Sequence, residues 1–154
     1  MSGLLKKLQY TNQPSIHVRS APREFADELA SFRTVATVST AANDRKKAGF
    51  ALFFVKSVSE IERFAPVAAR KIEEDGVLWF AYPKTASKRY TTDISRDRGW
   101  QSLGDLDFEA VRQVAIDEDW SALRFRPVDR IPVLKRDPRM AMTEKGRRRA
   151  SNRS

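Results

Sequence analysis

The stretch Phe50–Val55, FALFFV, is apolar at every position, and Val77–Tyr82, VLWFAY, repeats this pattern. A strand with one exposed face alternates apolar and polar residues, so an unbroken apolar run indicates a strand buried on both faces. Between the two runs, Ser57–Glu60 has the pattern of a helix-capping box, and apolar residues then recur at helical spacing as far as Ile72. This strand–helix–strand unit indicates a parallel α/β sheet with right-handed crossovers.

The segments on either side extend the same pattern. Ser15–Arg19 and Thr34–Ser39 are predicted strands on either side of a helix that starts near Phe25, while 110–116 and 121–127 can pair as an antiparallel hairpin. We therefore predict a Rossmann-like α/β fold: a mostly parallel sheet of about five to six strands, a C-terminal antiparallel hairpin and helices on both faces.

Several local signals mark where helices begin and end. Pro66 predicts a kink or a break in the helix that follows Ser57. Gly76 is expected to end that helix in the left-handed conformation. Asp93 is expected to cap a further helix that runs to about Leu103.

Composition limits the class of protein. The chain has 154 residues, which fits one domain, and no cysteine, which excludes disulfides, thiolate metal sites and cysteine nucleophiles. The start shows no signal-peptide pattern, and no apolar run is long enough to span a bilayer. We expect a cytoplasmic protein with no membrane partner.

The positive charge is concentrated at the C-terminus. From residue 135 onward, eight Lys or Arg and two Asp or Glu account for +6 of the net charge of +9. We expect an irregular lead-in over 1–14, one domain over 15–128 and a basic, disordered tail over 129–154. The tail either binds nucleic acid electrostatically or only solubilises the chain. Its candidate contacts are Lys145, Arg147, Arg148 and Arg149.

Parts of the sequence also resemble a known family. Asp75–Lys84 (DGVLWFAYPK), Thr92-Asp93 and Val114–Phe125 (VAIDEDWSALRF) resemble small bacterial proteins of unknown function that carry Trp-Pro-Lys, Thr-Asp-Leu and Val-Asp-Glu-Thr-Trp-Ser motifs. The chain departs from that pattern at Tyr82, Ile94 and Asp119. The likeness covers roughly Ser15 to Pro127. It implies a trimmed version of the class I methyltransferase sheet, and it implies no activity.

The turn after the first strand does not suit a nucleotide or S-adenosylmethionine. Such sites need glycines that let backbone amides approach the ligand at a helix start. Here Ser20, Ala21 and Pro22 occupy the turn, no glycine lies between Val18 and Phe32, and Pro22 has no amide hydrogen. We expect no such cofactor. Arg19 and Arg23 could hold a phosphate, although two solvated surface arginines are the simpler interpretation.

Two polar segments are further candidates. The loop after the second apolar strand could bind an anion such as phosphate, or could only cap the sheet. Its candidate residues are Lys84, Thr85, Ser87, Lys88, Arg89, Thr92 and Asp93. The hairpin turn could supply acid–base carboxylates, or could be only a turn with an aromatic packed at its end. Its candidates are Asp117, Glu118, Trp120 and Ser121.

No catalytic constellation is evident. His17 is the single histidine and is expected on a half-exposed strand, so we predict no metal site and no catalytic relay. The sequence favours a non-catalytic binding or interaction protein of unknown ligand on a degenerate methyltransferase-like fold. Two alternatives stay open: an enzyme that acts on a small anionic substrate at the Lys84–Asp97 loop, and a nucleic-acid-associated protein that acts through its tail.

Overall fold

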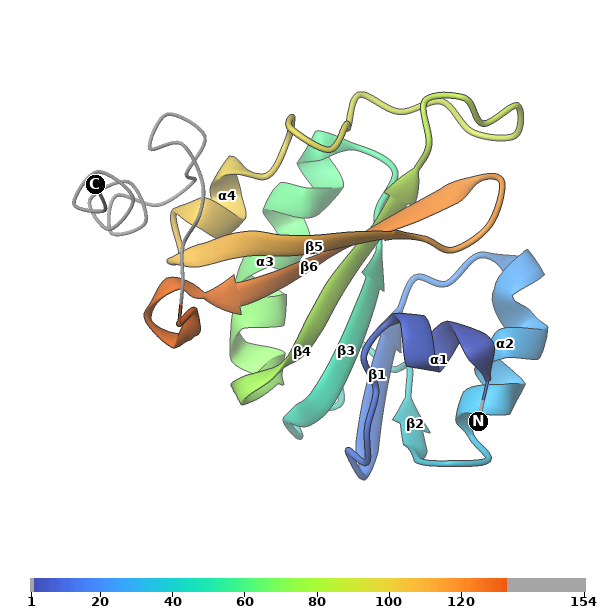
Figure 1. The fold of residues 1–154 in the computed structure, drawn as a ribbon, viewed down its shortest axis with the longest axis vertical. Coiled ribbons are helices and arrows are strands. Elements are labelled where there is room, and N and C mark those ends of the chain that lie inside the picture. The colour runs from blue at the N-terminus through green and yellow to red at the C-terminus, as the bar shows by residue number, and fades with distance from the viewer. Residues whose placement is uncertain (1, 133–154) are drawn as a thin grey trace.

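The computed structural model describes residues 2–132, which fold around one six-stranded sheet (Figure 1). The strands are β1 (Ser15–Arg19), β2 (Thr37–Ser39), β3 (Ala48–Phe54), β4 (Ile72–Pro83), β5 (Phe108–Ala115) and β6 (Trp120–Pro127). The helices are α1 (Gly3–Lys7), α2 (Ala26–Phe32), α3 (Val58–Lys71) and α4 (Gln101–Gly104). The strand order is β2-β1-β3-β4-β6-β5, with β1 to β4 parallel and β6 antiparallel to both of its neighbours. The predicted sheet and its C-terminal hairpin are confirmed.

The two faces of the sheet are covered by different helices (Figure 1). In β3, Ala51 and Phe53 pack in the core beneath α3 and α4, whereas Phe50, Leu52 and Phe54 pack in the core beneath α1 and α2. Successive side chains of a strand point to opposite faces, so a strand that is covered on both sides needs an apolar residue at every position. This explains the unbroken run FALFFV.

Helix α3 begins as predicted and ends differently. Ser57 accepts a hydrogen bond at its Oγ from the Glu60 amide (3.2 Å), and the Glu60 carboxylate accepts one from the Lys56 amide (2.6 Å). The helix continues through Pro66 as one element, so no break occurs there. Pro66 is exposed, and water can therefore satisfy the carbonyl that loses its helical donor.

The end of α3 corrects the prediction for Gly76. The helix stops at Lys71, and β4 starts directly at Ile72. Asp75 has the left-handed φ of 53°, in place of Gly76, and Arg126 holds the Asp75 carboxylate at 2.9 Å. Gly76 is needed for space, because a Cβ there would come within 2.9 Å of the Ile72 side chain.

The N-terminal segment is part of the core. The predicted irregular lead-in contains α1, and both Leu5 and Leu8 are fully buried. The Trp79 indole donates a hydrogen bond of 2.8 Å to the carbonyl of Leu8, and Arg124 donates one of 2.6 Å to the Gln9 side chain. The two buried leucines and these two long-range hydrogen bonds therefore fix the position of the segment.

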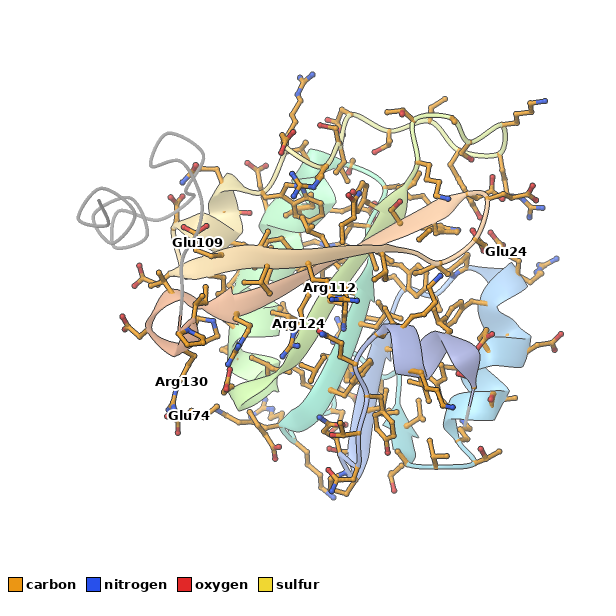
Figure 2. The ribbon with its side chains drawn as sticks, viewed as in Figure 1. Glu24, Glu74, Glu109, Arg112, Arg124 and Arg130 are labelled. Atoms are coloured by element: carbon orange, nitrogen blue, oxygen red, sulfur yellow. The ribbon has the colours of Figure 1, made fainter. Side chains whose placement is uncertain are left out.

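The chain remains packed beyond the predicted domain boundary at residue 128. Val128 starts a short 3-10 helix that ends at Arg130, and both Val128 and Ile131 are buried. Arg130 forms an ion pair with Glu74 of β4 (Figure 2). The remainder of the predicted tail, with its four basic candidates, lies outside the described residues. Among residues 2–132, no helix combines the length and the hydropathy that a membrane crossing requires.

Candidate functional site

The order of the strands locates the first place to look for a ligand. From β1 the chain first adds β2 on one side of β1 and then adds β3 on the other side. The order in which strands are added therefore reverses between β1 and β3, although these two strands are parallel. In open α/β sheets, ligands bind beyond the carboxyl ends of the strands at this reversal. We call the residues there, 20–24 after β1 and 55–57 after β3, the switch-point edge.

The turn after β1 offers few backbone donors to a ligand. Ser20 has a φ of 63°, a conformation that glycine would adopt at lower cost, and Pro22 has no amide hydrogen. The chain then forms a 3-10 helix over Arg23–Phe25 before α2 begins, and no side chain caps either helix. The regular α-helical N-terminus that normally faces a phosphate is therefore displaced from this turn.

The loop after β4 crosses the switch-point edge. Thr92 donates a hydrogen bond of 2.7 Å to the carbonyl of Lys56, which follows β3. Tyr90 donates a hydrogen bond to the carboxylate of Glu24, which follows β1. The Lys56 ammonium lies 4.9 Å from the centre of the Tyr90 ring. One loop thus contacts both segments between which a ligand of this fold would lie, and the Tyr90 ring lies between them.

Electrostatics support this bridge. The hydrogen bond from Tyr90 lowers the pKa of Glu24, so the carboxylate is ionised at neutral pH. Desolvation, followed by the same hydrogen bond to Glu24, raises the pKa of Tyr90, so its hydroxyl keeps its proton. Arg89 adds a third partner at 3.7 Å from Glu24. The bridge therefore joins a neutral donor, a carboxylate and a guanidinium at neutral pH.

The same loop also contacts the turn between β5 and β6. Ser87 donates a hydrogen bond of 2.8 Å to Asp119, and Arg89 lies 3.7 Å from the other oxygen of that carboxylate. A cavity of about 440 Å³ lies between the two segments, lined by Ala86, Lys88, Arg89, Glu118 and Asp119. Figure 2 shows Glu24, which lies in the 3-10 helix just before α2, near this turn. Of the predicted candidates, Lys88 and Arg89 from the loop and Glu118 from the turn therefore line one cavity.

Other predicted site residues have structural roles. Asp93 accepts a hydrogen bond of 2.9 Å from the Val58 amide, so it caps α3 and not the helix that follows it. Asp117 accepts hydrogen bonds from the amides of Asp119 and Trp120 (2.8 and 2.9 Å) and shapes the turn. Trp120 is buried against Phe54 and Tyr90.

The remaining predicted candidates take little part in the Tyr90–Glu24 bridge or in the cavity beside Asp119. Ser121 pairs with Tyr82 of β4 and is buried, and Lys84 is fixed through its backbone by the carbonyl of Asp119 (2.8 Å). Thr85 is exposed. Tyr90 and Glu24, which form the bridge, were not among the predicted site residues. The only signal for Tyr90 was an aromatic residue within a polar loop. No three His, Asp or Glu side chains of residues 2–132 come together as a metal-binding group.

Comparison with known proteins supports the same assignment of the fold. The N-methyltransferase NodS from Bradyrhizobium japonicum WM9 superimposes with a TM-score of 0.50 at 15% sequence identity, over 80% of this chain and 92% of that chain. The chain has a methyltransferase-like fold. The fibrillarin pre-rRNA processing protein of Methanococcus jannaschii gives a TM-score of 0.49 at 11% identity, over 75% of this chain and 67% of that one. No family model and no curated protein sequence matches the chain.

The switch-point edge lacks several features with which this kind of fold usually binds S-adenosylmethionine or a dinucleotide. Binding either molecule there requires close backbone approach and free amides after β1. In this chain Pro22 removes an amide, Ser20 and Ala21 carry side chains where glycines are needed, and Tyr90 bridges to Glu24. An acidic residue that could hold a ribose is also missing directly after β2, where Ser39-Thr40-Ala41 stands.

Proposed function

We propose that this chain is a non-catalytic binding or interaction protein on a methyltransferase-like fold, with its switch-point edge closed by its own loop. The observation that carries this proposal is that the loop after β4 contacts both segments, through Tyr90 to Glu24 after β1 and through Thr92 to Lys56 after β3. The glycine-free turn at Ser20–Pro22 supports it independently, because opening the loop would not restore the missing donors.

Titration calorimetry of the full-length chain with S-adenosylmethionine, S-adenosylhomocysteine and NAD tests this proposal. We expect no heat beyond dilution, with an active class I methyltransferase as the positive control for ligand quality. The Tyr90→Ala variant separates the effect of the closing loop from the effect of the glycine-free turn after β1. It should also show no binding, because the turn after β1 is unchanged. Micromolar binding of any of the three ligands by the natural chain would refute the proposal.

A second candidate is an enzyme that acts on a small anionic substrate at the Lys84–Asp97 loop. The cavity that Lys88 shares with Glu118 favours it, because a cation for binding and a carboxylate for proton transfer lie in one hollow. Arg89 is less available to an anionic substrate than Lys88, because it already contacts the carboxylates of both Glu24 and Asp119.

The enzyme proposal is tested by screening phosphorylated and carboxylated metabolites for turnover. Turnover that Glu118→Gln abolishes and Glu62→Gln leaves unchanged would support it, because Glu62 is an exposed carboxylate on α3 that lies outside this cavity. Turnover that both variants retain would exclude Glu118 as the acid or base.

A further inference from the structure

The connection between β2 and β3 leaves part of one sheet face without a helix. β2 and β3 both pair with β1, so the chain must cross β1 between them, and it does so with residues 40–47. Asp44 in this connection lies 3.4 Å from the Lys71 ammonium at the end of α3, which places the crossing on the α3 side of the sheet. Lys71 also donates a hydrogen bond of 3.0 Å to the Asp44 carbonyl.

Two polar side chains of β1 lie on this face, where the β2–β3 connection takes the place of a helix. His17 is fully buried, contrary to the expected half-exposed strand, because the β2–β3 connection passes near it. Its Nδ1 lies 2.8 Å from the Ser39 hydroxyl, whereas its Nε2 is buried without a partner. The guanidinium carbon of Arg19 lies over the rings of Phe53 and Phe64 (5.9 and 5.6 Å to the ring centres), and its Nε is also buried without a partner.

A cavity of about 440 Å³ opens between the β2–β3 connection and the second half of α3. It is lined by Arg19, Ala42, Asp44, Arg45, Val67, Arg70 and Lys71. The lining therefore has four cations and one carboxylate. The Asp44 carboxylate is already paired with Lys71, so the guanidinium groups of Arg19, Arg45 and Arg70 give the cavity an excess of positive charge.

The chemistry of these groups favours a compact dianion. A guanidinium presents a planar set of N–H donors that matches a phosphate or carboxylate, and Arg19, Arg45 and Arg70 all line this cavity. Buried polar atoms without partners are rare in folded proteins and commonly mark a bound ion, water or ligand that supplies the partner. The volume suits a small molecule.

We propose that this cavity is a phosphomonoester-binding site, formed by Arg19, Arg45, Arg70 and Lys71. The cations come from three segments, which are β1, the β2–β3 connection and α3, and all of them line the same cavity, so one phosphate group can contact more than one segment. Asp44 holds Lys71 in place and limits the net charge. The site is separate from the switch-point edge, and its existence does not depend on the proposed absence of a cofactor there.

Inorganic phosphate and glycerol 3-phosphate are the probes, and His17 is the reporter. Because His17 is the single histidine, its imidazole gives one unambiguous set of NMR signals in the full-length chain. We expect a saturable shift of these signals when either probe is added at constant ionic strength. Binding to the basic tail is a poor alternative explanation, because it would not perturb a buried imidazole of β1. Vesicles that carry phosphatidic acid distinguish a lipid headgroup from a soluble ester.

Charge-matched variants decide whether the cavity binds the anion. Arg70→Ala and Arg45→Ala should each weaken binding about tenfold, as expected for one lost charge-assisted hydrogen bond. Arg33→Ala removes the same charge from the exposed end of α2, on the opposite face of the sheet, and should leave binding unchanged. Absence of saturation in the natural chain overturns the proposal. An equal loss in Arg33→Ala and Arg70→Ala also overturns it, because the attraction is then nonspecific.

Discussion

Burial of His17 should make the stability of this protein depend on pH in a defined window. Desolvation by burial, together with the charges of Lys71 and Arg19 and against the opposing charge of Asp44, lowers the pKa of His17 from 6.5 to about 4. The unfolded chain binds a proton near pH 6.5, but the folded chain resists protonation until about pH 4. Stability is therefore complete above pH 6.5 and falls as the pH decreases toward 4.

The magnitude follows from the two pKa values. A difference of one pKa unit corresponds to about 1.4 kcal/mol, so the single imidazole should cost about 2 kcal/mol of unfolding free energy by pH 5 and about 3 kcal/mol by pH 4. This is a large share of the total for a domain whose net stability is typically about 5–15 kcal/mol.

Urea unfolding at pH 7, 6 and 5 in phosphate-free buffer measures the effect. The His17→Asn variant keeps a polar group near Ser39 but cannot titrate, so its stability should depend less on pH than that of the natural chain. The gap between the two chains should narrow by about 2 kcal/mol from pH 7 to pH 5. NMR titration of the natural chain measures the pKa of the folded-state His17 imidazole directly, without any variant. Parallel pH profiles, or a folded-state imidazole that titrates near 6.5, would refute the reasoning.

Three further perturbations test other contacts. Ser57→Ala removes the N-cap of α3 and should lower the unfolding free energy by about 1 kcal/mol in urea, whereas Ser31→Ala in α2 should have little effect. Trp79→Phe leaves the buried Leu8 carbonyl without its donor and should cost about 1–3 kcal/mol in the same assay. Gel shifts with and without residues 136–154 at two salt concentrations test the tail: nucleic-acid binding should weaken with salt and disappear on truncation, and equal behaviour of the full-length and truncated chains would refute that hypothesis.

The sheet could be predicted because its signals are local. Burial on both faces leaves an unbroken apolar run in Phe50–Val55, and the capping box at Ser57 marks where the following helix begins. These patterns depend on geometry within a few residues, which the sequence displays directly.

The candidate site could be predicted only in part, because its contacts join distant segments. Asp93 has the residue type of a local N-cap, yet it caps α3 through Val58, far earlier in the chain. The predicted loop and turn do meet in one cavity, but Arg89 is paired there with acids from two other elements. His17 looked half-exposed because the alternation of β1 carries no information about the connection that covers it.

The N-terminal segment has a consequence for the order of events during synthesis. Leu8 receives its hydrogen bond from Trp79, and Gln9 receives its own from Arg124, so these bonds cannot form until residue 79 and residue 124, respectively, have been made. Until then Leu5 and Leu8, which are fully buried in the folded protein, lack part of the core against which they pack. We expect α1 to dock last even though it is made first, because closing such long loops is slow compared with forming local helices.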